Sequence, residues 1–289
     1  MSLGVWLRLG RVSNLPTVWS NVLATLALTG ALSLSWRVLA LGGIFSLYYV
    51  GGMYLNDAFD RHIDAQQRPD RPIPSGQVSA RVVFGLGFAA LFAATLLLGL
   101  VAHAAGASLL RALASGAGLA LVIIGYDVYH KQNPLSPVVM GLCRVMVYVA
   151  GAFAVRSELA PAVLWGAAAL LCHLIGLSYA AKQEAYNRLA RVWPLGFLCA
   201  PALYGVYLAG SQPWVWPFLA VLVLWVAYSS SYLRPGPQRS VPQAVVRLIA
   251  GIALLDAVLI ASTGAGGWAL VALLLAAATR LFQRVIPGT

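Results

Sequence analysis

Ten apolar stretches divide this sequence, and most are long enough to cross a lipid bilayer as a helix. A membrane-spanning helix needs about 20 apolar residues, and these stretches with short connections account for nearly the whole chain. The sequence therefore predicts an all-α, polytopic membrane helix bundle of about nine or ten transmembrane helices, forming a single domain over residues 1–289. The expected spans are 14–33, 37–56, 80–102, 107–126, 136–154, 160–180, 193–209, 213–232, 243–262 and 267–284.

Composition supports the same class of protein. Charged residues make up 9% of the 289 residues, against about 25% in an average soluble domain. A soluble domain of this size needs far more polar surface, so a cytosolic enzyme, a secreted scaffold and a disordered chain are excluded. The stretch 193–209 contains Pro194 and Pro201, so we expect that span to be tilted, broken or interfacial.

Positive charge is distributed unevenly among the connections. The chain has 19 Lys and Arg against 8 Asp and Glu. If the N-terminus is cytoplasmic, the outward side holds only Arg37, Arg111 and Arg156, and nearly all other basic residues face inward. This positive-inside bias predicts a multi-pass protein of the cell (inner) membrane with its N-terminus and active-site loops in the cytoplasm. It accounts for most of the net charge without a nucleic-acid partner.

Three of the eight acids lie on one predicted helix face directly after the second apolar stretch. Asp57, Asp60 and Asp64 are three and four residues apart, a spacing that stacks side chains on one side of a helix. Clustered carboxylates suit a hard divalent cation, above all Mg²⁺. The alternative is a solvated helix end neutralised by Arg61, Arg68 and Arg71. We favour the metal, with Arg68 and Arg71 as phosphate ligands, because guanidinium groups match phosphate oxygens.

The same segment carries a family resemblance. Asn56-Asp57-x-x-Asp60-x-x-x-Asp64, followed by Arg71-Pro72-Ile73-Pro74-Ser75-Gly76, resembles the first aspartate-rich motif of the UbiA family of intramembrane aromatic prenyltransferases. Three weaker matches follow the family order. Arg11-Val12-Ser13-Asn14 is similar to its Arg-Pro-x-Asn. The set Tyr126, His130, Lys131 and Gly141 is similar to its Tyr-x-x-x-Lys-Arg segment with a downstream Gly, and Tyr179-Ala180 to the start of its second aspartate-rich motif.

The second motif departs from the family pattern. Two or more aspartates are expected there, but the chain has Lys182-Gln183-Glu184-Ala185-Tyr186-Asn187-Arg188. At most one carboxylate remains, so Glu184 and Asn187 are weak replacements for metal ligands. Two interpretations stay open. Either this is a positive loop that has lost the second metal, or Lys182 or Arg188 replaces the charge of that metal beside the diphosphate.

Polar side chains inside the predicted spans are further candidates. An arginine within a membrane helix usually faces a polar cavity, so Arg144 is expected to bind diphosphate or acceptor, with an ion pair to Asp127 or to the aspartate cluster as the alternative. Asn21 is expected to share the cavity of Asn14. His173 and Asp256 are interpreted as hydrogen-bonded packing residues.

The resemblance implies Mg²⁺-dependent prenyl transfer from an isoprenyl diphosphate to a lipophilic or aromatic acceptor within the membrane. It implies that Asp57, Asp60 and Asp64 hold the cation. Arg68, Arg71 and Lys131 would bind the diphosphate, assisted by Asn56, and Asn14, Asn21 or Tyr126 would orient the acceptor. Two alternatives remain: a UbiA-like protein that binds or moves a prenylated lipid without transfer, and a secondary transporter that uses Arg144, His173 and Asp256.

Overall fold

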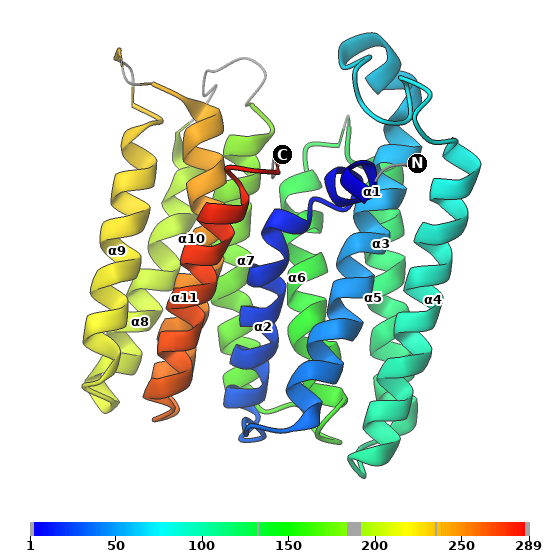
Figure 1. The fold of residues 1–289 in the computed structure, drawn as a ribbon. Helices are drawn as coiled ribbons and strands as arrows, with labels where there is room; N and C mark the ends of the chain where they lie inside the picture. The colour runs from blue at the N-terminus through cyan, green and yellow to red at the C-terminus, as the bar shows by residue number, and fades with distance from the viewer. Residues whose placement is uncertain (1–2, 132, 184–191, 235, 238, 287–289) are drawn as a thin grey trace.

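A computed structural model describes residues 3–131, 133–183, 192–234, 236–237 and 239–286, and every regular element in those residues is helical. The long helices run along one common axis (Figure 1). Each of the ten apolar stretches corresponds to one of them, from α2 to α11. Their bounds are α2 Leu15–Leu28, α3 Trp36–Gln67, α4 Ala80–Ala104, α5 Leu109–Tyr129, α6 Ser136–Phe153, α7 Pro161–Ala181, α8 Cys199–Ser211, α9 Val215–Ser231, α10 Val241–Ala261 and α11 Gly266–Phe282.

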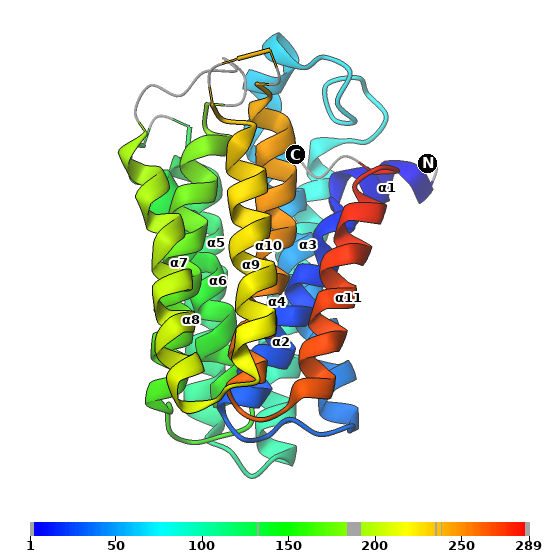
Figure 2. The same ribbon diagram turned by 90° about the vertical axis from the view of Figure 1, so that its left-hand side faces the viewer.

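Three short helices complete the described part of the chain: α1 Leu3–Leu9, η1 Val12–Asn14 and η3 Trp193–Leu198. Helix α1 lies across the bundle axis, near the end of α11 (Figure 2). The proline-containing stretch is divided as expected, because the 3₁₀ helix η3 precedes α8.

Seven of the described segments are long and apolar enough to cross a membrane: α3, α4, α5, α6, α7, α10 and the combined segment Trp193–Ser211. Helices α9 and α11 are apolar but shorter. The chain is therefore a multi-pass membrane protein with the predicted all-α fold, and the number of crossings stays a prediction.

Local sequence sets where several helices begin. The hydroxyls of Ser79, Ser108 and Ser240 accept backbone N–H bonds at the start of α4, α5 and α10, respectively. Such N-caps satisfy donors that have no partner inside the helix. Proline occupies the first turn of α2, α6, α7 and α10, where its missing N–H costs nothing.

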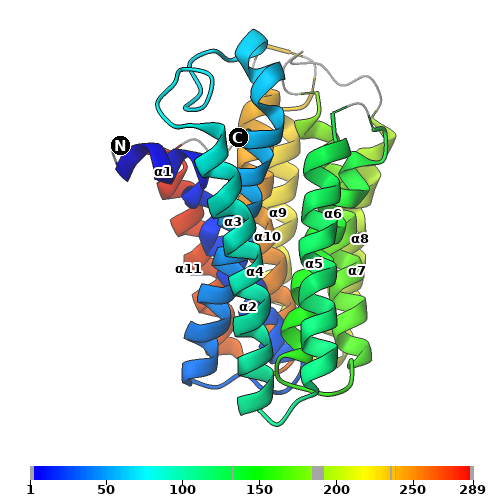
Figure 3. The ribbon, with the colours of Figure 1, turned by 90° about the vertical axis from the view of Figure 1, so that its right-hand side faces the viewer.

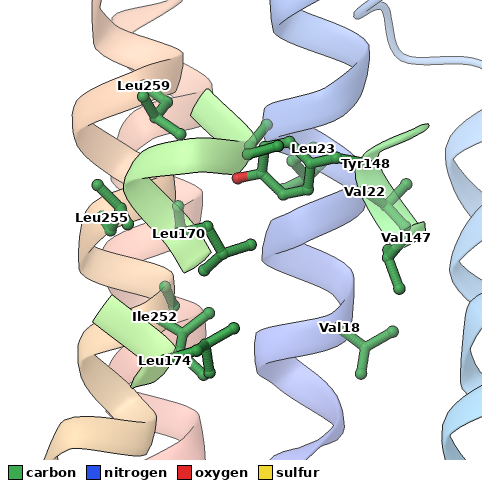
Figure 4. Close-up of a cluster of buried hydrophobic side chains, with 14 of the residues drawn as sticks. Val18, Val22, Leu23, Val147, Tyr148, Leu170, Leu174, Ile252, Leu255 and Leu259 are labelled. Carbon is green, nitrogen blue, oxygen red and sulfur yellow. The ribbon is translucent and has the colours of Figure 1, made fainter. Parts of the chain in front are cut away.

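Helix α10 is the most buried of the candidate spans and contacts α2, α7, α9 and α11. Its Ile252, Leu255 and Leu259 face α2 and α7 in the cluster drawn in Figure 4. Helices α7, α8 and α9 form one side of the bundle (Figure 2), and α4 and α5 form the opposite side (Figure 3). Gly87 permits the close approach of α3 and α4, since a Cβ there would lie 2.7 Å from the Leu55 side chain.

Helix α3 is longer than the bilayer requires. Its 32 residues span about 48 Å at 1.5 Å per residue, against a hydrocarbon thickness of about 30 Å. Its last turns and the connection to α4 extend from the bundle at the end where both chain termini lie (Figure 1). The aspartate-rich segment therefore lies at that end of the membrane protein.

Candidate active site

A cavity of about 340 Å³ lies between the helices and extends from this end into the bundle. Its outer part is ionic and is lined by Asp60, Asp64, Arg68, Arg71, Lys131 and Asp127. Its inner part is apolar and is lined by Phe45, Leu119, Ile123, Val147, Leu174 and Ile252. One cavity thus combines a charged end with an apolar interior.

The first aspartate-rich segment places its acids as the spacing predicts. Asn56, Asp57, Asp60 and Asp64 are all buried on α3, with exposed fractions between 3% and 6%. Burying three carboxylates this closely is unfavourable unless each gains a partner of opposite charge. The structure supplies such a partner to every one of them.

Two arginines hold Asp57 and Asp64. A terminal nitrogen of Arg71 lies 2.7 Å from Asp64 Oδ2 and 3.3 Å from Asp57 Oδ1. Arg11 approaches from the loop before α2 and donates to Asp57 Oδ1 at 3.1 Å and to Asn56 Oδ1 at 3.3 Å. Asp57 therefore faces two guanidinium groups, and Asp60 and Asp64 are the members of the triad that line the cavity.

The two residues that follow α5 supply the partners of Asp60. Lys131 Nζ lies 2.8 Å from Asp60 Oδ2, and His130 Nε2 lies 3.5 Å from the same oxygen. The His130 ring stacks on Tyr126 with ring centroids 4.8 Å apart. The Tyr-x-x-x-His-Lys segment is thus brought directly against the aspartate-rich segment of α3.

Arg11 reaches the site through an uncommon backbone conformation. Its φ of 42° and ψ of 45° lie in the left-handed region, which costs a residue with a Cβ roughly 1–2 kcal/mol. Such strain persists where surrounding interactions fix it, and here Asn56 and Asp57 do so. Burial tends to lower the pKa of Arg11, but the Asp57 carboxylate outweighs burial, so this pKa is raised above its ordinary value.

A second polar cluster lies deeper in the bundle. Arg144 on α6 donates to Asn21 Oδ1 at 2.8 Å and to Thr17 Oγ1 at 3.1 Å, and its guanidinium lies 5.5 Å from the ring centroid of Tyr49. Asn21 in turn donates to Asp256 Oδ2 at 2.8 Å. The alternative of an ion pair between Arg144 and Asp127 or the aspartate cluster is therefore wrong, because the described contacts of Arg144 are to neutral oxygens and to Tyr49.

The cavity gathers most of the residues predicted from the sequence. Its lining includes Asn14, Asn56, Asp60, Asp64, Arg68, Arg71, Tyr126, Lys131 and Arg144. Asn21 lies behind Arg144 and is fully buried. The Lys182 ammonium donates to Asn133 O at 2.6 Å and to Ser136 Oγ at 3.2 Å, away from the cavity wall. Glu184 and Asn187 lie outside the described residues.

Two residues of the site were not selected from the sequence. Arg11 belongs to a recognised motif, but nothing in the sequence indicates that it pairs with Asp57, 46 positions away. Asp127 lies next to Tyr126 and lines the cavity while 3% exposed. The available signal was an acid at the end of an apolar stretch in a chain with only eight acids.

The fold and the site define a membrane helix bundle with clustered carboxylates and cations at the mouth of an apolar cavity. The model of the UbiA prenyltransferase family matches residues 13–240. The chain belongs to the UbiA prenyltransferase family, as its motifs predicted.

Several curated proteins match parts of the chain. A digeranylgeranylglyceryl phosphate synthase of Methanothrix thermoacetophila is 39% identical over 97 residues, covering 33% of this chain and 36% of the relative. The synthase of the same name from Methanoculleus marisnigri is 34% identical over 136 residues, covering 47% and 46%. The bacteriochlorophyll synthase 33 kDa chain of Cereibacter sphaeroides is 35% identical over 68 residues, covering 23% and 22%. The chain thus spans less than half the length of each of these relatives.

Solved structures share the fold over almost the whole chain. A structure of digeranylgeranylglyceryl phosphate synthase matches with a TM-score of 0.60 and 17% identity, covering 94% of this chain and 98% of that chain. A UbiA homologue from Archaeoglobus fulgidus bound to DMAPP and Mg²⁺ matches with a TM-score of 0.58 and 16% identity, covering 88% and 98%. At these identities the likeness concerns the fold.

Proposed function

We propose that this protein catalyses the Mg²⁺-dependent transfer of a prenyl group from an isoprenyl diphosphate to a lipophilic or aromatic acceptor within the membrane. The observation that carries the proposal is the single cavity that joins an ionic mouth to an apolar interior. An isoprenyl diphosphate has the same two parts, a charged head group and a hydrocarbon tail. Family membership and the diphosphate and Mg²⁺ bound by a homologue of the same fold support this assignment.

The donor atoms of the mouth fit Mg²⁺. Mg²⁺ is commonly bound through one or two carboxylates, with water and substrate phosphates completing its shell. Asp60 and Asp64 present carboxylates to the cavity. Within the described residues no group of three Asp, Glu, His or Cys side chains is gathered around one point, so we propose that substrate oxygens and water would complete the shell. When bound, Mg²⁺ supplies positive charge beside the diphosphate oxygens.

Basic side chains of the mouth would bind the remaining diphosphate charge. Arg68 lines the cavity without an ion pair to any described carboxylate, so its guanidinium is available to phosphate. Arg71 and Lys131 contact Asp64 and Asp60 in this structure. We propose that both turn toward the diphosphate when Asp60 and Asp64 hold the cation. The two basic side chains would then pair with phosphate oxygens, and the two carboxylates would pair with the cation.

In the reaction, the C1–O bond of the allylic diphosphate breaks and its electron pair leaves with the diphosphate. A bond then forms between C1 and a nucleophilic atom of the acceptor, which loses a proton. Arg68, Arg71 and Lys131 stabilise the charge that develops on the leaving group. Asn14 and Tyr126 line the same cavity and would orient the acceptor. The apolar wall formed by Phe45, Ile123 and Val147 excludes water from the allylic cation.

Arg144 is proposed to bind a polar group of the acceptor. Its guanidinium lines the same cavity and has no ion pair with any carboxylate of the described residues. A guanidinium in this position favours an anionic or hydrogen-bond-accepting group. We propose that Asn21, which accepts a hydrogen bond from Arg144, holds the guanidinium in place.

The transporter alternative gains no support from the positions of its proposed residues. His173 is fully buried and bonds to Leu248 O at 3.0 Å. Asp256 is fully buried among Ser20, Asn21 and Tyr148, as expected for helix-to-helix bonds. Neither lines the cavity that Arg144 lines. We also propose that the cavity mouth faces the cytoplasm of a cell membrane, which the distribution of basic residues favours.

The test is to incubate the purified protein in liposomes with Mg²⁺, labelled isoprenyl diphosphates of several lengths and candidate acceptors, and to identify products by mass spectrometry. An Asp60→Asn variant should lose at least about 100-fold in turnover, since removing several kcal/mol of charge stabilisation slows a reaction tenfold for each 1.36 kcal/mol. Glu158→Gln, the same kind of change at an exposed residue of the opposite end, is the matched control. Binding of the diphosphate without product would instead favour a non-catalytic lipid-binding protein.

A further inference from the structure

Asp127 is the carboxylate of the site whose bonding is incomplete. It lies near the end of α5, is 3% exposed and lines the cavity. Its Oδ1 accepts a hydrogen bond from Asn56 Nδ2 at 3.1 Å. Its Oδ2 is buried and has no hydrogen-bond partner. A carboxylate oxygen in that state loses its hydration without compensation, which is unfavourable by roughly 1–3 kcal/mol or more.

Its neighbours differ in this respect. Asp57 is paired with Arg11 and Arg71, Asp64 with Arg71, and Asp60 with Lys131 and His130. No basic side chain of the described residues forms an ion pair with Asp127. The three α3 acids are therefore compensated within the chain, whereas one oxygen of Asp127 has no partner among the described residues.

The link to Asn56 fixes where that oxygen lies. Asn56 precedes Asp57 on α3, and Arg11 donates to the Asn56 carbonyl oxygen while the Asn56 amide donates to Asp127. An amide held at both ends in this way ties α5 to the first aspartate-rich segment. Asp127 and Asp60 therefore line one cavity from two different helices, as the two carboxylates of a cation site do.

The sequence after α7 indicates why a carboxylate at position 127 matters. The segment 182–188 offers one carboxylate, Glu184, where the family pattern has several aspartates. Amide oxygens replace carboxylates poorly as Mg²⁺ ligands. A carboxylate on α5 would restore negative charge to the cation site from another part of the chain.

We propose that Asp127 is a ligand of the divalent cation that accompanies the diphosphate, with Asn56 as the residue that orients its carboxylate. This inference rests on the proposed function, because it assumes that a divalent cation and a diphosphate share the cavity. It adds a ligand from α5 to those expected from the two aspartate-rich motifs.

The experiment measures Mn²⁺ binding, which needs no turnover. Purified protein in detergent is titrated with Mn²⁺ in the presence of inorganic pyrophosphate, and free Mn²⁺ is followed by electron paramagnetic resonance. Asp127→Asn keeps an oxygen that can accept the bond from Asn56 and removes the negative charge. We expect it to weaken Mn²⁺ binding at least about tenfold, as loss of a group at a metal site commonly does. The Glu158→Gln control should bind Mn²⁺ as the unmodified protein does.

A second variant, Asp127→Ser, guards against a folding defect of the first, because its smaller side chain leaves room for water. Mn²⁺ affinity that is unchanged in a monodisperse Asp127→Asn or Asp127→Ser protein overturns the inference. If the unmodified protein binds no Mn²⁺ with pyrophosphate, both the proposed function and the inference about Asp127 fail. If the unmodified protein and both variants bind Mn²⁺ equally, the proposed function stands and only the role of Asp127 is lost.

Discussion

Arg144 and Asp256, on helices α6 and α10, are joined through a single amide. Asn21 accepts from Arg144 through Oδ1 at 2.8 Å and donates to Asp256 through Nδ2 at 2.8 Å. A neutral side chain thus connects the cation that lines the cavity to the acid at the bundle centre. The amide must keep one orientation, since only that orientation meets a donor on one side and an acceptor on the other.

Replacement of Asn21 should therefore disturb both ends of this connection. Asn21→Ala leaves Arg144 and the buried Asp256 each short of one hydrogen bond, and we expect a loss of about 1–3 kcal/mol of stability. Thermal unfolding in detergent measures the effect. Thr25→Val is the control, because Thr25 lies one turn further along α2 and its hydroxyl donates to the backbone carbonyl of Asn21. Equal stability of the Asn21→Ala protein and the unmodified protein would contradict the connection.

Arg68 and Arg71 should respond differently to the same substitution. Arg68→Gln removes a cavity-facing cation without breaking an ion pair, so we expect unchanged thermal stability. Its KM for the diphosphate should rise about tenfold, the equivalent of one charge-assisted hydrogen bond of roughly 1.5 kcal/mol. Steady-state kinetics over a range of donor concentrations checks this expectation.

Arg71→Gln should in addition destabilise the protein, because Asp57 and Asp64 both lose a partner. Loss of one member of a buried pair costs about 3–5 kcal/mol. We expect about 2 kcal/mol here, since the Arg71 side chain remains 17% exposed and water partly replaces it. Thermal unfolding of the two variants side by side separates the roles, and equal unfolding midpoints would contradict the distinction.

Removal of divalent cations should abolish activity without unfolding the protein. Each α3 aspartate has a basic partner within the chain, so we expect the fold not to depend on the cation. Chelation with EDTA should stop prenyl transfer and leave the unfolding midpoint unchanged, and added Mg²⁺ should restore turnover. A large drop in the midpoint on chelation would show instead that the metal is structural.

Gly52 should limit the space for the donor tail. It lines the cavity, and a Cβ at this position would lie 2.9 Å from the Ile123 side chain. Gly52→Ala should therefore displace Ile123 toward the tail and lower turnover of long donors more than that of short ones. Gly43→Ala is the matched control on the same helix, because a Cβ there meets nothing within 4 Å. The ratio of products from a mixture of donors is the measurement.

Periodicity and spacing within single helices made much of this fold and site predictable. Apolar stretches predicted all ten long helices of the described chain, and the spacing of Asp57, Asp60 and Asp64 predicted their shared face. These features depend on the regular rise and turn of one helix, which the sequence determines locally.

Contacts between helices were less predictable. The alternative considered for Arg144 was an ion pair with an acid, but its side chain donates to Asn21 and Thr17. A place for Lys182 at the diphosphate was one of two open interpretations, and in the structure its ammonium bonds to the α5–α6 connection. The pairing of Asp60 with Lys131 depends on how α3 and α5 pack against one another, and no pattern within either segment encodes that geometry.

Helix α3 carries the residues proposed to bind the head group and those proposed to contact the tail on one continuous surface, with Phe45, Tyr48, Tyr49, Gly52, Asn56 and Asp60 all lining the cavity. From Asp60 the helix reaches Gly52 after about 12 Å and Phe45 after about 22 Å. In the proposed function, the position of a side chain along α3 therefore sets how far from the proposed cation site it contacts the tail. Any substitution that rotates or shifts α3 would move the proposed cation site and the tail-contacting side chains together. The accepted tail length can therefore be changed selectively only by altering the size of individual side chains along the helix.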